Sequence, residues 1–220
     1  MLDMIPLPPP VVSRFAPSPT GYLHLGHLVN AIYVWGMTRA LHGNVILRME
    51  DHDRGRCRPD YEAAILEDLE WLGLEPDRGL AEEFVAGPTP YRQSDNDGRY
   101  DDVLRDLEAR HLIYTCTCSR KEVQARNGRM KGELRYDGHC RLKGYAPEKE
   151  GGTRLILHPE NINFYDHRLG LQTQEPFHHC GDVLLKDRHG CWTYQFAVTV
   201  DDWQQGVDLV IRGEDLLEST

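Results

Sequence analysis

The sequence predicts an α/β protein with a doubly wound parallel sheet and an inserted subdomain. Between residues 11 and 49, an apolar run, a Pro/Gly turn, an amphipathic helix and a second apolar run follow one another. A strand, a crossover helix and a second strand in this order make neighbouring parallel strands. A cysteine-rich segment lies between Cys116 and Cys140, and sheet-like apolar runs return after residue 183. The cysteine-rich segment is therefore predicted to be an insertion in the main fold.

Composition narrows the class of protein. The 220 residues are 40% hydrophobic and 27% charged, which is typical of a globular chain with a buried core. No apolar run reaches the roughly 18 residues that a membrane span needs. The first residues lack the cationic start of a secretion signal, so we expect a cytoplasmic protein with a flexible leader over residues 1–10. We also expect a monomer. The net charge of −10 argues against broad nucleic-acid binding and leaves only a local RNA contact.

The first predicted turn has the chemistry of an anion site. Residues 11–15 favour a strand, and the prolines and glycine of residues 16–21 force a turn. Apolar residues then recur at helical spacing over residues 25–43, so His24 and His27 flank the first helical turn. Unpaired N–H groups and the helix dipole attract anions there, and imidazoles add donors. This favours phosphate or nucleotide binding, although an isolated H-x-x-H is also common as a surface pair.

The second apolar run ends at an acidic residue. Residues 44–49 read NVILRM, as in a central parallel strand, and Glu50 follows at once. Ligands of such sheets bind beyond the carboxyl ends of the strands, where residues 16–18 and Glu50 both fall. Glu50 is therefore predicted to pair with an ammonium group. The alternative is an ordinary solvated loop acid.

The remaining elements are mostly scaffold. Helical patterns over residues 60–74 and 94–110 carry apolar stripes. Alternation over residues 151–171 predicts short strands in the insertion, and residues 183–196 predict a hairpin. Residues 208–212, DLVIR, predict another buried parallel strand.

The cysteine-rich segment predicts a metal site. Cys116 and Cys118 are separated by one residue, and Cys140 follows with His139 beside it and Tyr136 nearby. Thiolates close in sequence converge on one ion with only a tight turn, and a tetrahedral zinc site needs four such donors. Six cysteines without an export signal indicate a reducing compartment, where metal binding is commoner than disulfides. The alternative is a group of reduced, buried thiols.

Three stretches together resemble one enzyme family. RFAPSPTGYLH, from Arg14 to His24, resembles the first signature of the class I aminoacyl-tRNA synthetases, in its glutamyl branch. LRMEDHDR and WTYQFAVTVDDW resemble two further blocks of that branch, and the resemblance extends from Val11 to Thr220. It implies a Rossmann-like catalytic domain that is an ATP-dependent ligase. It also implies that glutamate is bound by Arg14, Ala16, Ser18, Glu50, Tyr194 and Arg212, and ATP by Pro17, His24, Gly26 and His27, with the histidines catalytic.

The cysteine pattern resembles a narrower group. C-x-C followed by Y-x-G-x-C-R is similar to the zinc insert of the short, queuosine-directed relatives of the glutamyl-tRNA synthetases. The resemblance implies one structural Zn²⁺ held by Cys116, Cys118, Tyr136 and Cys140. Tyrosine is an unusual zinc donor, so His139 remains a rival for the fourth position.

The resemblance also implies a domain order. Residues 11–110 would form the first half of the catalytic domain, 111–182 a zinc-binding, acceptor-like insertion, and 183–220 the second half. The last lysine is Lys186, so the expected KMSKS-type motif is absent from these 220 residues.

The implied reaction is activation of L-glutamate by ATP, with Mg²⁺, to glutamyl-adenylate. Transfer of glutamate to queuosine in the anticodon of tRNA(Asp) would follow. Val198 stands where glutamyl-tRNA synthetases usually have Asn, which favours the short relatives. Two alternatives remain. One is an N-terminal catalytic fragment of a glutamyl-tRNA synthetase that charges tRNA(Glu), and the other is a turnover-deficient module that binds zinc and nucleotide.

Overall fold

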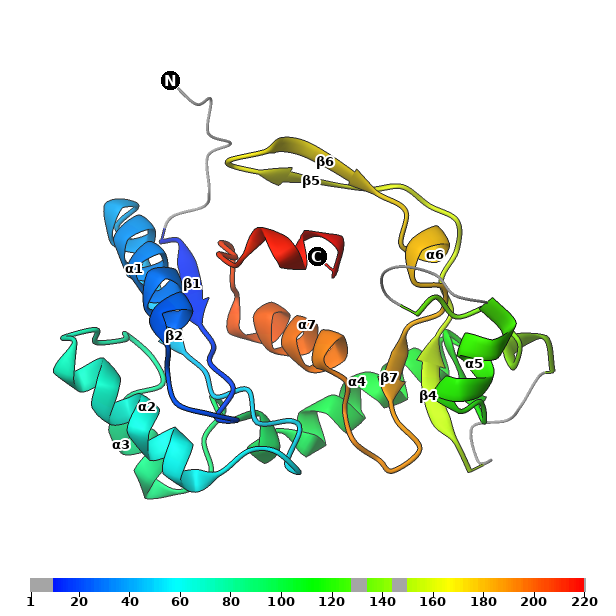
Figure 1. Cartoon of the computed structure of the whole chain (residues 1–220), viewed down its shortest axis with the longest axis horizontal. Coiled ribbons are helices and arrows are strands. Elements are labelled where there is room, and N and C mark those ends of the chain that lie inside the picture. The colour runs from blue at the N-terminus through cyan, green and yellow to red at the C-terminus, as the bar shows by residue number, and fades with distance from the viewer. Residues whose placement is uncertain (1–9, 128–133, 144–149, 220) are drawn as a thin grey trace. The chain divides into compact units, whose positions relative to one another are not determined.

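The computed structural model describes residues 10–127, 134–143 and 150–219 (Figure 1). Most of the expected leader, residues 1–9, lies outside this range. The described elements are, in order, β1 (Val12–Phe15), α1 (Leu25–Ala40), β2 (Asn44–Leu47), α2 (Pro59–Trp71), α3 (Ala81–Ala86), η1 (Gln93–Asp95), α4 (Asp97–Ala109), β3 (Ile113–Cys116), α5 (Arg120–Asn127), η2 (Arg141–Lys143), β4 (Gly152–Leu155), β5 (Ile162–Asp166), β6 (Gly170–Gln174), α6 (Pro176–His179), β7 (Leu184–Lys186), α7 (Tyr194–Gln205) and η3 (Glu214–Ser219).

The chain forms two compact units. Residues 10–101 and 197–219 form one, which we call the sheet unit, and residues 102–196 form the other, the cysteine unit. Among the described helices, none has both the length and the apolar character needed to cross a membrane.

The sheet unit is built on a parallel βαβ unit. Strands β1 and β2 pair in parallel from Val12 with Asn44 onward, and α1 connects them and packs against both (Figure 1). Isolated parallel bridges pair Leu209 with β1 at Ser13 and Arg78 with β2 at Ile46. A third joins Arg92 to Met49, just after β2. The predicted α/β class with parallel strands is confirmed.

One apolar core lies between α1, α2 and the parallel strands. The β-branched and aromatic residues of β1 and β2 favour extended backbone, and the helices cover them with residues at three- and four-residue spacing. Burial of this surface provides the main stabilisation of the unit. The buried members are Phe15, Ala31, Val34, Trp35, Val45, Leu47, Met49, Ile65, Leu69 and Phe84.

Two expected strands near the end of the chain are wrong in extent. Within residues 208–212, only Leu209 forms a β-bridge with β1, and Val210 is exposed. The segment is therefore an isolated bridge and not a β-strand. The second half of the expected hairpin is mostly helix, because α7 begins at Tyr194. Trp192 still forms an antiparallel bridge with Lys186, so the hairpin ends there, and its ring packs against that of Phe196 on α7 at a centroid distance of 5.3 Å.

The cysteine unit is a small antiparallel assembly. Strand β4 pairs with β3 on one side and β7 on the other, and β5 and β6 form a separate hairpin. The expected short strands over residues 151–171 are confirmed, and β6 continues past them. Helix α5 starts with a capping box, in which Ser119 N donates to Glu122 Oε2 at 2.7 Å and Glu122 N donates to Ser119 Oγ at 3.2 Å.

Candidate functional site

His24 and His27 are joined at the start of α1. His24 is the N-cap residue, and its Nδ1 accepts a hydrogen bond from Gly26 N at 3.1 Å. His24 N in turn donates to His27 Nδ1 at 3.2 Å, and the ring centroids lie 3.9 Å apart. A Cβ at Gly26 would lie 3.0 Å from the His24 ring, so the absence of a side chain there eases the cap. The two predicted histidines are therefore linked to each other and together cap the start of α1.

This capping arrangement fixes the tautomer of each neutral ring. Because both Nδ1 atoms accept hydrogen bonds from backbone N–H groups, each neutral imidazole carries its proton on Nε2. Burial, and secondarily the neighbouring His24, lowers the pKa of His27, which favours the neutral ring at pH 7. The helix start thus offers Nε2–H donors near the positive end of the dipole, a suitable arrangement for phosphate oxygens.

The turn after β1 is tied to the end of the β2 segment. Glu50 N donates to Pro17 O at 3.0 Å, and Ser18 Oγ donates to Glu50 O at 2.8 Å. Ala16 lies between β1 and these contacts. The structure therefore brings together four predicted positions at the carboxyl ends of neighbouring parallel strands, where α/β proteins bind ligands.

A buried chain of alternating charges runs behind these positions. Arg48 Nη2 donates to Glu50 Oε1 at 2.9 Å, and Arg48 Nη1 donates to Asp202 Oδ1 at 2.7 Å. Arg14 Nε donates to the same Asp202 carboxylate at 3.1 Å. Arg48 is fully buried, and Arg14 and Glu50 are each only 5% exposed. The order Arg14, Asp202, Arg48, Glu50 therefore fixes two of the three predicted charged ligands of glutamate, Arg14 and Glu50, relative to each other.

Asp201 is a second carboxylate beside Arg48. Its oxygens accept hydrogen bonds from Gln93 Nε2 at 2.8 Å and from the Tyr100 hydroxyl at 3.0 Å, and Arg48 Nε lies 3.8 Å away. Burial raises the pKa of Asp201, although Arg48 acts in the opposite direction. Burial acts to lower the pKa of Arg48, but Glu50 and the two aspartates overcome it and raise that pKa. The guanidinium is charged at every accessible pH.

The sequence does not predict this charge network. Arg48 lies in a predicted apolar strand and in one block of the family resemblance, and Asp201 and Asp202 lie in another block. Charged residues inside otherwise apolar runs were the available signal, because such residues are almost never fully buried unless paired. Their pairing itself could not be predicted, since Arg48 and Asp202 are 154 residues apart.

Two further residues predicted to bind glutamate, Arg212 and Tyr194, lie outside this chain of charges. Arg212 follows Ile211, whose carbonyl accepts a hydrogen bond from Asn30 Nδ2 of α1 at 3.2 Å. The Arg212 segment therefore runs beside the second turn of α1. Tyr194 is the first residue of α7 and belongs to the cysteine unit. In the described part of the chain, no hydrogen bond joins the histidine pair to Glu50 or Arg14.

A cavity of about 460 Å³ lies beside the predicted nucleotide turn. Arg58 N donates to Pro19 O at 3.0 Å, which fixes the cavity wall to the turn, and the Arg58 guanidinium donates to the carbonyls of Gly55 and Cys57. None of its lining residues is among the site residues predicted from the sequence. Its lining residues are Pro19, Asp51, Arg54, Cys57, Arg58, Pro59, Glu62, Arg92 and Ser94.

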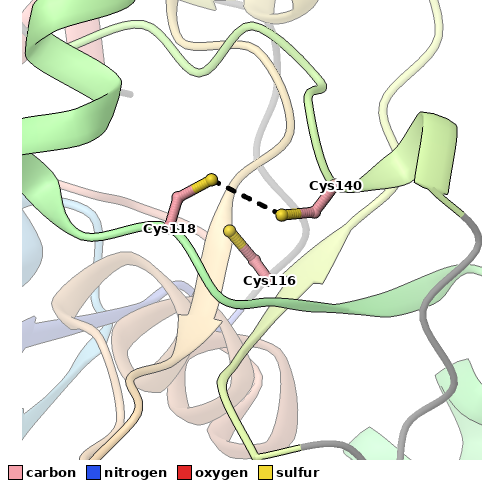
Figure 2. Close-up of side chains that lie close together, drawn as sticks. All are labelled: Cys116, Cys118 and Cys140. Carbon is pink, nitrogen blue, oxygen red and sulfur yellow. Dashed lines mark hydrogen bonds between the residues drawn. The ribbon is translucent and has the colours of Figure 1, made fainter.

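The three predicted cysteine ligands converge in the cysteine unit. Figure 2 shows Cys116 at the end of β3, Cys118 two residues on and Cys140 before η2, with their sulfurs turned toward one another. The sulfurs all lie within 4.8 Å of one another, and those of Cys118 and Cys140 are 3.4 Å apart. Tetrahedral zinc with Zn–S bonds of about 2.3 Å requires sulfur separations of about 3.8 Å. The cluster therefore fits a metal ion of this kind.

The Tyr136 hydroxyl lies beside the cysteine sulfurs and is the candidate for the fourth donor atom. Its hydroxyl oxygen lies 3.3 Å from Cys116 Sγ and 3.8 Å from Cys118 Sγ, and it accepts a hydrogen bond from Cys140 N at 2.8 Å. His139 does not join the cluster that the described residues form. The geometry therefore favours Tyr136 over His139.

Gly181 holds the Tyr136 backbone in place. Its φ is +66°, which glycine adopts without strain, and a Cβ there would lie 2.0 Å from Tyr136 O. Tyr136 N also donates to Cys180 O at 2.8 Å.

The protonation of the cluster is uneven. Burial acts to raise the pKa of Cys140, but hydrogen bonds, chiefly from Tyr136 and Thr117, overcome it and lower that pKa to about 7. Burial raises the pKa of Cys118. At least one thiolate is thus accessible near neutral pH, as a metal site requires.

The structure thus combines a parallel βαβ unit, with a pair of histidines at the start of its helix, and a cluster of three cysteines. The family model for the class I tRNA synthetases (E and Q), catalytic domain, matches residues 10–220. The chain therefore belongs to this family, and the resemblance inferred from its motifs is confirmed.

Individual relatives narrow the comparison. Proteins named glutamyl-Q tRNA(Asp) synthetase from Rhodobacter capsulatus and Cupriavidus metallidurans are 39% and 40% identical, over 96% and 94% of this chain. The chain spans 79% and 65% of those relatives. Glutamate–tRNA ligase 1 of Acidithiobacillus ferrooxidans is 38% identical over 96% of this chain, which spans 44% of that ligase.

Solved structures agree with this assignment. The crystal structure of a glutamate tRNA ligase from Elizabethkingia meningosepticum, in complex with its amino acid, has a TM-score of 0.76 to this chain and 31% sequence identity. The match covers 95% of this chain and 45% of that one.

Proposed function

We propose that this chain activates L-glutamate with ATP and transfers the glutamyl group to queuosine in the anticodon of tRNA(Asp). The observation that carries the proposal is the buried charge chain that holds Arg14 and Glu50 at the carboxyl ends of adjacent parallel strands. The Arg14 guanidinium could pair with a carboxylate of an amino acid, and the Glu50 carboxylate could pair with its ammonium group. The two named relatives above support the choice of tRNA(Asp).

Glutamate would be held by groups of opposite charge. Glu50 would bind the α-ammonium, and Arg14 and Arg212 would face carboxylate oxygens, since a guanidinium fork matches a carboxylate. Ala16 and Ser18 would line the turn, and Tyr194 would shape the pocket. Asp202 accepts from Arg14 Nε, so it would orient the Nη groups toward the substrate. Glutamine would bind worse, because its neutral amide leaves a guanidinium underpaired.

ATP would bind at the start of α1. Pro17 and Gly26 would allow close approach of the phosphates, and the Nε2–H groups of His24 and His27 would donate to their oxygens. Mg²⁺ would accompany ATP. A glutamate carboxylate oxygen would bond to the α-phosphorus while the bond from that phosphorus to the β-phosphate oxygen breaks, releasing pyrophosphate. Donors fixed in advance lower the barrier by positioning and by electrostatic stabilisation.

A structural zinc ion would be held by Cys116, Cys118, Tyr136 and Cys140. Zinc would cross-link β3, the segment after it and the segment before η2, and it would stabilise the cysteine unit. Metal analysis of the purified chain should find about one zinc per molecule, and Cys116→Ser should reduce that content. A zinc-free wild-type chain, or unchanged content in Cys116→Ser, would refute the site.

The remaining expectations follow the family. We propose a cytoplasmic monomer in which residues 11–110 and 183–220 build the catalytic domain and residues 111–182 the insertion. Gel filtration with light scattering tests the monomer.

Transfer assays on two purified tRNAs test the acceptor. Labelled glutamate should join queuosine-containing tRNA(Asp), and the product should not form on tRNA(Asp) that lacks queuosine. The second candidate is charging of tRNA(Glu) at its 3′ end, favoured by the 38% identity to a glutamate–tRNA ligase. Labelling of tRNA(Glu) alone would support that candidate and overturn the first. ATP binding without transfer to either tRNA would support the turnover-deficient module.

A further inference from the structure

Two arginines flank the cysteine cluster without being candidate ligands themselves. Arg126, on α5, donates from Nη2 to Cys118 Sγ at 3.3 Å. Arg154, on β4, places its guanidinium carbon 3.7 Å from the centroid of the Tyr136 ring. A guanidinium has no acceptor atom and remains charged, so neither side chain can bind a cation. Each instead brings one positive charge to a different donor of the proposed metal site.

Both guanidinium groups are held in place by other contacts. Arg126 donates to the Asp137 carboxylate from Nε at 2.6 Å and from Nη2 at 3.2 Å. Arg154 donates from Nη1 to Asp182 O at 2.7 Å. In the described part of the chain, the buried Nε of Arg154 has no hydrogen-bond partner. Stacking on the Tyr136 ring is therefore a principal interaction of that guanidinium.

The charge of the proposed donor set explains why cations would be needed. Three thiolates and one divalent ion leave one excess negative charge, and a metal-bound phenolate would add a second. Two guanidinium groups bring charge of the opposite sign to these donors, and Arg126 does so as part of an ion pair with Asp137. Tyr136 and Cys140 are at most 2% exposed, so water can offset little of this charge.

We propose that Arg126 and Arg154 are positioning residues that balance the charge of the zinc site and thereby set its affinity for the ion. This inference rests on the zinc site proposed above. Arg126 acts through Cys118, and Arg154 acts through the ring of Tyr136. Partners of metal ligands outside the donor set commonly change metal affinity by about 10- to 100-fold.

Chelator competition on the full chain tests this role. Zinc content is measured after incubation with a graded series of a metal-buffering chelator, for wild type, Arg126→Gln and Arg154→Gln. We expect both variants to lose zinc at free-zinc levels about tenfold or more above the level at which wild type does. Arg126→Lys should recover part of the affinity, because it restores the charge without the planar fork.

Matched variants separate charge balance from general stability. Arg120→Gln, at an exposed position on the same helix, should retain zinc as wild type does. If Arg154→Gln does not fold, the single variants Arg126→Gln and Asp137→Asn are compared instead. Asp137→Asn should weaken zinc binding less than Arg126→Gln does.

The outcomes distinguish the two proposals. A zinc-free wild-type chain would contradict the zinc site itself. A zinc-loaded wild type with unchanged retention in Arg126→Gln and in any folded Arg154→Gln would overturn only the charge-balancing role.

Discussion

Replacing Arg48 with Met should strongly destabilise the sheet unit. Arg48 is 0% exposed, donates to Glu50 and Asp202, and lies 3.8 Å from Asp201. Methionine fills much of the volume but leaves buried carboxylates without their shared cation. Breaking a buried ion network by removing one partner costs about 3–5 kcal/mol. Small domains are stable by only about 5–15 kcal/mol in total, so this loss is large.

The measurement is urea unfolding followed by tryptophan fluorescence at pH 7.5, with Arg54→Met as the matched control. Arg54 pairs with Asp97 at 2.8 Å, but the two side chains are 60% and 52% exposed. An exposed pair of this kind contributes about 0–1 kcal/mol. A loss in Arg48→Met no larger than in Arg54→Met would refute the view that the network stabilises the fold.

The same variant has a pH signature. Burial raises the pKa of Asp201 in the native protein while Arg48 lowers it, so removing Arg48 raises that pKa further. An acid whose folded-state pKa is raised favours the folded state at low pH and loses that contribution as pH rises through the folded-state value. The deficit of Arg48→Met relative to wild type should therefore be smaller at pH 5 than at pH 7.5.

Three further predictions follow from local geometry. Gly181→Ala, whose new Cβ would lie 2.0 Å from a carbonyl oxygen, should lower the free energy of unfolding in urea by at least about 1–3 kcal/mol and should retain less zinc. The control Gly190→Ala, also at positive φ but with open space around it, should lower that free energy less. Burial raises the pKa of Asp77, but hydrogen bonds from an arginine and a backbone N–H lower it overall. Asp77→Asn should therefore cost about 0.5–1 kcal/mol at pH 7, after allowance for partial exposure, and this cost should vanish as pH falls below about 4. His24→Ala should raise the pKa of His27 toward its ordinary value in an NMR titration, because it removes one of two lowering causes; an unchanged pKa would contradict the pairing.

Local signals in the sequence predicted a good part of the fold. The strand, Pro/Gly turn and helix up to His27 depend on contacts only a few residues apart, and the strand and the helix start form as expected. The capping hydrogen bonds of His24 and His27 were not predicted. The cysteine cluster was predictable from spacing as well. One residue separates Cys116 from Cys118, and Cys140 lies 22 positions beyond Cys118.

Distant contacts account for what the sequence did not predict. The pairing of Arg48 with Asp202, and of Gln93 with Asp201, joins residues more than 100 positions apart. Residues 208–212 have a strand-like composition, but the backbone hydrogen bonds that they donate to β1 come from Asp208 and Leu209, and both reach the carbonyl of Val12. Burial and partners, which composition does not encode, decided each of these cases.

Glutamate-dependent ATP–pyrophosphate exchange by the purified chain, without tRNA, tests the central claim most directly. Glu50→Gln should reduce exchange sharply, because it removes the charge for the ammonium group, while the exposed Glu67→Gln should not. The account predicts exchange with L-glutamate and far less with L-glutamine. No exchange, or equal exchange with both amino acids, would contradict it.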